Sequence, residues 1–386
     1  MSSRRRHQRH SHMTPGKILI RFQCVCRHWR DLFKTPSFIA DHLHYSNHRN
    51  PYLLFQRGHL DYPSDLYSLD SEMQLRKFQN PPFLDHFKRG KILASSNGLL
   101  CVETNEPLES PHSLLVWNPA IKEVRLVPKT NLYGDCYHYS VGFGFCPSIN
   151  DYKIVITYYV INFNANDYVV DMFKVYSLRS RSWKDLKYRF NACCISYSGT
   201  FNGVMFWVGL KKVGEDDGVY RREDYESLCF SFDLAMEVWT VIPVPEERPC
   251  SLCERFTVYE EKLAFLSCPI DCQPSVLHLW VMEEGVGASG KTWNWIKKYT
   301  SNPYPGLLRF TAMWRNEIFC RILGLESTAV LFNPTTKKIK KLNISKCNDE
   351  YRIFNYVESL VSIGGTKSFT KFPKHRGSSS GVRTMT

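Results

Sequence analysis

The sequence predicts a mainly β protein, a β-propeller of about five to six blades preceded by a short α-helical segment. The 386 residues are 14% aromatic and include 21 glycines and 20 prolines, a composition that favours strands joined by tight turns. A strand-rich unit recurs along most of the chain, whereas helical periodicity ends near Tyr45. An irregular β-sandwich with long loops is the competing architecture.

The excess positive charge lies at the two ends of the chain. The formal net charge is +13, and residues 1–30 hold eight Lys and Arg while residues 366–386 hold five, with no acid in either segment. The body between them has 37 basic and 37 acidic residues, so it lacks the basic excess typical of a nucleic-acid-binding domain. We expect basic disordered tails at residues 1–13 and 366–386 and no nucleic-acid partner. The Arg4–Arg9 run leaves open a nuclear-import or RNA-contacting patch.

Neither a membrane span nor a secretory signal is predicted. The most apolar stretch, residues 154–163, is about ten residues long, whereas a spanning helix needs about 20. The first 13 residues are charged and no apolar core follows them. We therefore expect a cytoplasmic or nuclear protein whose 14 cysteines are reduced thiols.

Residues 14–45 predict helices. Thr14 is suited to cap a helix that begins at Pro15, and Pro36 disfavours helical backbone at Thr35 and ends that helix. A second short helix is expected at residues 37–44. Because so short a helical segment has no core of its own, it must dock on the body or on another protein. Side chains at spacings of 3, 4, 3 and 4 form one face of the first helix: Leu19, Phe22, Cys26, Trp29 and Phe33.

The long body consists of a repeated unit of two hairpins. Each unit contains a strand centred on an aromatic residue, a polar turn and a second strand, as in LLVWNPAIKEVRLVP from Leu114. Asn97-Gly98 and Asn202-Gly203 predict hairpin turns in which both central positions need positive φ. Four strands in about 50 residues is typical of a kelch-like β-propeller. The central aromatic residues lie 50, 59, 56, 48 and 52 residues apart: Tyr67, Trp117, Tyr176, Phe232, Trp280 and Phe332.

The regular spacing assigns the repeat tryptophans to the core rather than to a ligand cage. This prediction covers Trp117, Trp183, Trp239 and Trp280. Binding residues are expected instead in loops held by the rigid scaffold. The long insertions at residues 212–224 and 283–292 are the candidates.

The sequence contains no motif for catalysis or cofactor binding. It has no P-loop, no nucleophile elbow and no HExxH. Cys250, Cys253, Cys268 and Cys272 approach the spacing of a zinc ribbon. However, Cys268 ends a predicted strand and Cys250 lies in a proline-rich loop, which favours ordinary thiols. We expect no enzyme activity, no metal and no cofactor.

The helical segment carries one specific motif, LIRFQCVCRHWRDLF followed by TPSF. It resembles the second half of the F-box of plant F-box proteins. The first helix of that family, opened by Leu-Pro, is not matched by RRRHQRHSHM. In the family the F-box is a three-helix hook whose apolar faces insert into the SKP-family adaptor of an SCF ubiquitin ligase. The resemblance implies a partial F-box at residues 14–45, with adaptor-binding residues Pro15, Leu19, Phe22, Val25, Cys26 and Trp29.

The repeats carry a second set of motifs, among them SSNGLLCV, WNPAIKEVRLVP, GFGFCPSINDYKIV, GTFNGVMFW and LFNPTTKKIKKL. Together they resemble the F-box-associated domain of plant F-box proteins over residues 51–363, with YVESLVSI as a closing strand. In that family the domain recognises a target or partner protein and has no catalytic activity.

The two resemblances imply the substrate-recognition subunit of an SCF-type E3 ubiquitin ligase. Its expected partners are a SKP-family adaptor, a cullin reached through that adaptor, and an unidentified protein target. Because the first F-box helix is not matched, a second hypothesis stays open. It is a non-catalytic interaction scaffold that is uncoupled from the ligase.

Overall fold

The chain folds as a mainly β protein with two short helices in its described part. The predicted basic tails, residues 1–13 and 366–386, lie outside that part, as do residues 14–25 of the predicted helical segment. The computed structural model describes residues 26–49, 51–58, 65–78, 89–105, 113–130, 138–162, 167–212, 225–245, 254–268, 274–287, 290–303, 307–323, 328–342 and 350–364.

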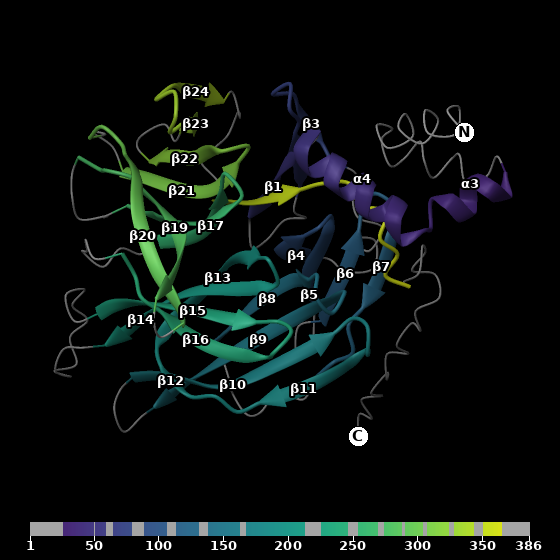
Figure 1. Ribbon diagram of the computed structural model, residues 1–386, viewed down its shortest axis with the longest axis horizontal. Coiled ribbons are helices and arrows are strands. Elements are labelled where there is room, and N and C mark those ends of the chain that lie inside the picture. Colours follow the sequence, from purple (N-terminus) through teal and green to yellow (C-terminus); the bar gives the residue numbers. More distant parts are fainter. Residues whose placement is uncertain are drawn as a thin grey trace, which may run out of the picture.

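Six antiparallel sheets form the body within these residues and are arranged as the blades of a propeller (Figure 1). The prediction of five to six blades is confirmed, and the competing sandwich is wrong. Blade 1 contains β1 (Tyr52–Gly58), β2 (Leu66–Leu69), β3 (Leu75–Lys77) and β25 (Glu350–Tyr356). Blade 2 contains β4 (Arg89–Ser96), β5 (Leu99–Asn105), β6 (Ser113–Asn118) and β7 (Glu123–Leu126).

The remaining four blades follow one another along the chain. Blade 3 contains β8 (His138–Cys146), β9 (Asp151–Asn162), β10 (Asp167–Ser177), β11 (Ser182–Leu186) and a short extra strand, β12 (Phe190–Asn191). Blade 4 contains β13 (Cys193–Phe201), β14 (Val204–Lys212), β15 (Tyr225–Asp233) and β16 (Val238–Ile242). Blade 5 contains β17 (Glu254–Tyr259), β18 (Lys262–Ser267), β19 (His278–Gly287) and β20 (Gly290–Thr300). Blade 6 contains β21 (Leu307–Trp314), β22 (Glu317–Leu323), β23 (Thr328–Phe332) and β24 (Ile339–Leu342).

The last strand of the chain closes the ring. β25 pairs with β1 along its whole length, from Tyr356 opposite Tyr52 to Glu350 opposite Gly58, and is the innermost strand of blade 1. The innermost strands contact one another in order around the axis, from β4 through β8, β13, β17, β21 and β25 back to β4. Blade 1 is therefore completed by segments from both ends of the repeat region, which locks the ring.

The predicted position of the closing strand is wrong. Of YVESLVSI, residues 356–363, only the first residue belongs to β25, and the rest forms a segment without strand structure. This segment binds blade 2: Asn118 Nδ2 donates to the carbonyl oxygens of Ser359 at 3.0 Å and Val361 at 2.8 Å. It buries Val357, Leu360 and Ile363, so its apolar residues pack in the core although the backbone joins no sheet.

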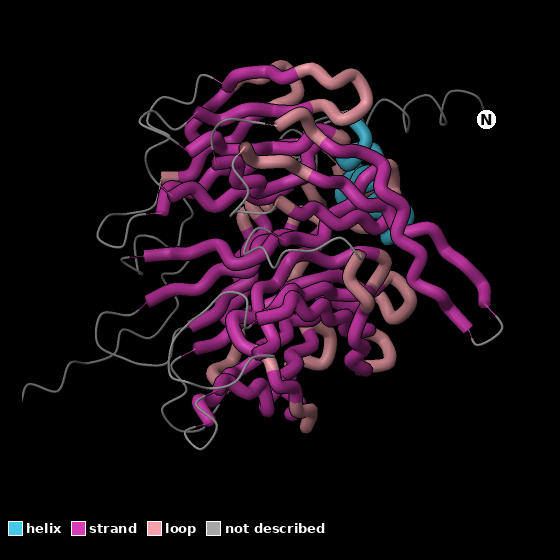
Figure 2. Tube along the Cα trace, turned by 90° about the vertical axis from the view of Figure 1, so that its left-hand side faces the viewer, coloured by secondary structure: helices cyan, strands magenta, loops and turns pink. Residues whose placement is uncertain are grey.

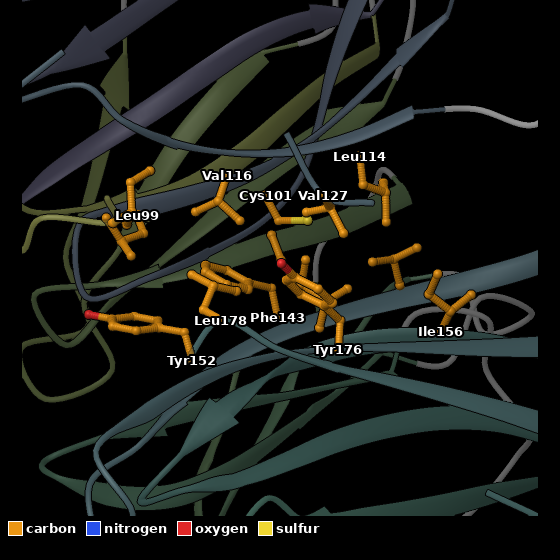
Figure 3. Packing of buried hydrophobic residues seen from close by; sticks show 14 of the residues in the cluster. Leu99, Cys101, Leu114, Val116, Val127, Phe143, Tyr152, Ile156, Tyr176 and Leu178 are labelled. Atoms are coloured by element: carbon orange, nitrogen blue, oxygen red, sulfur yellow. The ribbon is translucent and has the colours of Figure 1, made fainter. Parts of the chain in front are cut away.

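One apolar cluster fills each gap between neighbouring blades. Between blades 2 and 3, Leu99 and Val116 face Phe143 and Tyr176 (Figure 3). The six repeat aromatics lie in six different clusters, each between its own blade and the preceding one: Tyr67, Trp117, Tyr176, Phe232, Trp280 and Phe332. The repeat length predicted from the sequence therefore equals the number of residues between one interblade cluster and the next.

The core prediction for the repeat tryptophans is confirmed for three of the four. Trp117, Trp239 and Trp280 are buried. Trp183 lies on the outer strand β11 and is half-buried, and its indole N–H donates to the carbonyl oxygen of Pro128 at 2.7 Å.

Both predicted Asn-Gly turns are confirmed. Asn97 and Gly98 have φ values of 47° and 79°, and Asn202 and Gly203 have 47° and 78°. These left-handed conformations suit the tight turns between the first and second strands of blades 2 and 4. Gly98 has an additional role, since a Cβ atom there would lie 2.4 Å from Cβ of Ser359.

The two faces of the propeller differ in their connections. Because successive antiparallel strands reverse direction, the turns from first to second and from third to fourth strand lie on one face of the ring. The second strands end, and the third strands begin, on the opposite face. Figure 2 shows the short turns gathered with the helices on the right-hand side of the strands. We call this the helix face and the other the far face.

The helical segment is divided differently from the prediction. Cys26 has extended backbone, with φ −154° and ψ 160°, and caps α3 (Arg27–Leu32), so the predicted helix through Cys26 is wrong. α4 (Pro36–Arg49) has a proline at its first position and is longer than the predicted residues 37–44. Within the described residues, neither helix has the length and apolar character needed to cross a membrane.

Candidate protein-interaction site

A small apolar cluster docks both helices on the propeller. Phe33, at the end of α3, and Phe38, in α4, have ring centroids 4.9 Å apart. They pack against Ile121 in the β6–β7 turn and Leu360 in the segment after β25. The expectation that the helices dock is confirmed, with the propeller itself as the docking surface.

The break between the helices is held by Thr35. Its hydroxyl donates to the carbonyl oxygen of Leu32 at 2.7 Å and accepts the backbone N–H of Phe38 at 3.4 Å. Thr35 thus closes α3 and caps α4 at the same time. This local geometry sets the angle at which both aromatic rings enter the cluster.

α4 runs across the helix face from blade 2 to blade 5, which are opposite each other in a ring of six. Its first turn is held at Ile121 of blade 2. In its last turn, His48 Nε2 lies 3.4 Å from Glu261 Oε1 in the β17–β18 turn of blade 5. A helix of 14 residues is about 21 Å long, and it joins the outer β6–β7 turn of blade 2 to the inner β17–β18 turn of blade 5. The last turn of the helix therefore lies at the propeller axis, where Asn47 is beside the innermost strands.

The contact at the end of α4 depends on protonation. The carbonyl oxygen of His44 and the carboxylate of Glu261 raise the pKa of His48. A raised pKa means that the contact contributes below the ordinary value of 6.5 and is lost as pH rises through the higher folded-state pKa. His48 and Glu261 are both well exposed. The contact therefore stabilises the docked helix less than the apolar cluster does.

The predicted adaptor residues fall into two groups. Pro15, Leu19, Phe22 and Val25 lie outside the described residues. Of the other two, Cys26 is exposed, with its Sγ atom 3.5 Å from the backbone nitrogen of Trp29. Trp29 is half-buried, and its ring packs edge-on against Phe33 at a centroid distance of 5.4 Å. Trp29 therefore helps to seat α3 on the propeller.

The described parts of the two predicted binding insertions lie on opposite faces. Lys212 ends the second strand of blade 4 on the far face, and residues 213–224 lie outside the described residues. Residues 283–287 and 290–292 belong to the hairpin of β19 and β20 on the helix face. They are strand rather than loop, with Glu283 opposite Asn294 and Gly287 opposite Gly290. Figure 2 shows this hairpin projecting to the right of the body.

The described side chains offer little reactive chemistry. Burial raises the pKa of the Cys101 and Cys320 thiols, which keeps them protonated and poorly nucleophilic at neutral pH. Cys268 of the possible zinc set is fully buried, whereas Cys250, Cys253 and Cys272 lie outside the described residues. No group of three metal-binding side chains occurs in the described part of the chain.

Comparison with known proteins assigns the family. Residues 64–363 match the family model of the F-box associated beta propeller domain. The chain belongs to this family. The match covers blades 2 to 6 completely. It ends at Ile363, within the segment after β25 that is bound to blade 2.

Relatives of this F-box-associated propeller are plant F-box proteins. A putative F-box protein of Arabidopsis thaliana is 26% identical over 242 residues, which cover 59% of this chain and 56% of that protein. F-box protein CPR1 of the same plant is 25% identical over 386 residues, 90% of this chain and 85% of that protein. Putative F-box only protein 9, also from Arabidopsis thaliana, is 23% identical over 382 residues, 92% of this chain and 93% of that protein.

Proposed function

We propose that this chain is the substrate-recognition subunit of an SCF-type E3 ubiquitin ligase, acting in the cytoplasm or nucleus. The helical segment would bind a SKP-family adaptor and through it a cullin, while the propeller binds a protein target. The proposal is supported by the family assignment together with the F-box-like motif at residues 14–45.

The strongest structural support for this proposal is the docking of the helices on the propeller. A ligase receptor must hold its target at a defined position relative to the adaptor, which a flexible linker does not do. Here Phe33 and Phe38 join α3 and α4 to blade 2 through a buried cluster, and His48 reaches blade 5. Movement of the helical segment would therefore move the propeller with it.

The same arrangement favours the far face for the target. An adaptor bound to the helical segment would lie on the helix face, and the strand ends of the far face would then lie on the side away from it. Lys212 at the end of β14 and Tyr225 at the start of β15 are on that face. We propose that target-binding residues are in or beside the segments that join these strand ends, and that the β19–β20 hairpin is closer to the adaptor.

Substitution of the helical segment tests the adaptor contact. Leu19→Asp and Phe22→Asp are each expected to weaken binding of purified SKP-family adaptor at least tenfold. One large apolar side chain buried in an interface contributes about 1.5–3 kcal/mol, and 1.4 kcal/mol is a factor of ten. Isothermal titration calorimetry on the full chain measures the effect.

Leu75→Asp is the matched control, because Leu75 is an exposed apolar residue on β3, at the outer edge of blade 1. It is expected to leave adaptor affinity unchanged. If the unsubstituted chain does not bind the adaptor, or if Leu19→Asp binds as well as Leu75→Asp does, the ligase role fails. The interaction scaffold uncoupled from the ligase would then be the better description.

A further inference from the structure

A cavity that is open to solvent lies on the propeller axis beneath the end of α4. It has a volume of about 300 Å³, at the lower end of the range for sites that bind small molecules. The innermost strands β4, β13, β17, β21 and β25 line it, and Asn47 of α4 contributes to its rim. None of these strands alone forms the cavity, which exists because the ring is closed.

The lining of the cavity combines polar and apolar side chains with one positive charge. It includes Ser96, Asn97, Thr200 and Asn355, which offer hydroxyl and amide groups. Among the described residues that line it, Arg255 on β17 is the one side chain charged at neutral pH, and no carboxylate is present. A cavity with this lining attracts an anion and repels a cation.

Arg255 lies on the innermost strand of blade 5 and lines the cavity. The residue is partly exposed, although burial lowers the pKa of its guanidinium while neighbouring Tyr197 raises it. Both observations fit a side chain that lies deep in a cavity open to solvent at one end. The Tyr197 hydroxyl, which donates to the carbonyl oxygen of Phe143 at 2.7 Å, holds the wall beside it.

Open space for a ligand body lies next to these polar groups. Gly199 on β13 lines the cavity, and a Cβ atom at this position would meet no atom within 4 Å. Ala312 and Met313 on β21 add apolar surface. A ligand with an anionic head and an uncharged, partly apolar body matches this division better than a bare inorganic ion does.

We propose that the axial cavity binds a small organic carboxylate, with Arg255 as the group that holds the carboxylate. The planar guanidinium donates two parallel hydrogen bonds to a carboxylate. Because Asn47 of α4 lies at the rim, an occupied cavity also supports the helix that crosses the axis. The site is independent of the proposed ligase function and would remain if adaptor binding failed.

Binding of benzoate to the full chain, measured by calorimetry, tests the proposal. A fragment of this size is expected to bind with a Kd on the order of 1 mM and a stoichiometry near one. Benzamide, which has the same shape without the charge, and benzylamine, which is a cation, are expected to bind at least tenfold more weakly. Inorganic phosphate is expected not to compete with benzoate.

Two variants locate the site independently. Arg255→Met is expected to weaken benzoate binding at least tenfold, and Arg76→Met is its control, because Arg76 is an exposed cation on β3. Gly199→Leu fills the open space without removing a charge and is expected to abolish binding even if Arg255→Met folds poorly. Equal binding of benzoate and benzamide, displacement of benzoate by phosphate, or full affinity in Gly199→Leu would overturn the proposal.

Discussion

A chain that ends at Asp349 is expected to lose the cooperative unfolding transition of the full protein. The truncation removes β25, which pairs with β1 from Tyr52 to Gly58 and contacts the inner strands of blades 2 and 6. It also removes the apolar contacts of the segment that follows. The buried side chains lost are Ile353, Tyr356, Val357, Leu360 and Ile363.

Burial of five such side chains is worth on the order of 10 kcal/mol, comparable to the whole free energy of unfolding of a typical domain. A chain that ends at Gly364 is the control, because it retains β25 and the bound segment. Urea unfolding followed by tryptophan fluorescence compares the two chains. Equal midpoints for both would show that ring closure by β25 does not stabilise the propeller.

Gly98→Ala is expected to destabilise the protein by about 3 kcal/mol or more. Any side chain at this position adopts the left-handed conformation at a cost of about 1–2 kcal/mol. The new Cβ atom would also lie 2.4 Å from Cβ of Ser359 and 2.6 Å from the carbonyl oxygen of Val357. Displacing the segment after β25 adds about 1–3 kcal/mol, the usual cost of overpacking.

Gly203→Ala separates the two contributions. Gly203 occupies the same position of an Asn-Gly turn with φ 78°, but its nearest contact to a new Cβ atom would be Cys146 Sγ at 3.2 Å. The control is therefore expected to lose only the conformational part, about 1–2 kcal/mol. Equal losses in equilibrium urea unfolding would mean that the contact between Gly98 and the C-terminal segment carries no stability.

The propeller was predictable because its signals are local and repeated. An aromatic strand centre followed by a polar turn recurs at nearly constant spacing, and the structure uses each such residue, for example Trp117 or Phe232, in a separate interblade cluster. The Asn97-Gly98 turn needed only its own two residues. Such features require no knowledge of distant partners.

Features set by distant partners were predicted less well. Residues 350–356 and 357–363 both contain buried apolar side chains, and only pairing with β1, some 300 residues earlier, decides which of them is the strand. Similarly, the glycines at 285, 287 and 290 indicate a loop, but pairing across β19 and β20 overrides their weak strand preference. The axial cavity around Arg255 has no sequence signal, because six blades must meet before it exists.

The helical segment shows a third limit. Apolar spacing predicted one continuous helix through Cys26, yet the backbone there is extended and α3 starts one residue later. The spacing of apolar residues correctly predicted that Trp29 and Phe33 pack together. The same spacing could not predict where the helix begins, because periodicity is insensitive to a single extended residue.

Ubiquitin transfer in a reconstituted ligase tests the proposed coupling of adaptor and propeller most directly. The full chain is combined with SKP-family adaptor, cullin complex, ubiquitin and the activating and conjugating enzymes. We expect the chain's own lysines to be modified, since the docked helices hold the propeller within the assembly. This modification should disappear in the double variant Leu19→Asp, Phe22→Asp. Absence of modification in the unsubstituted chain, or equal modification of the double variant, would contradict a receptor role.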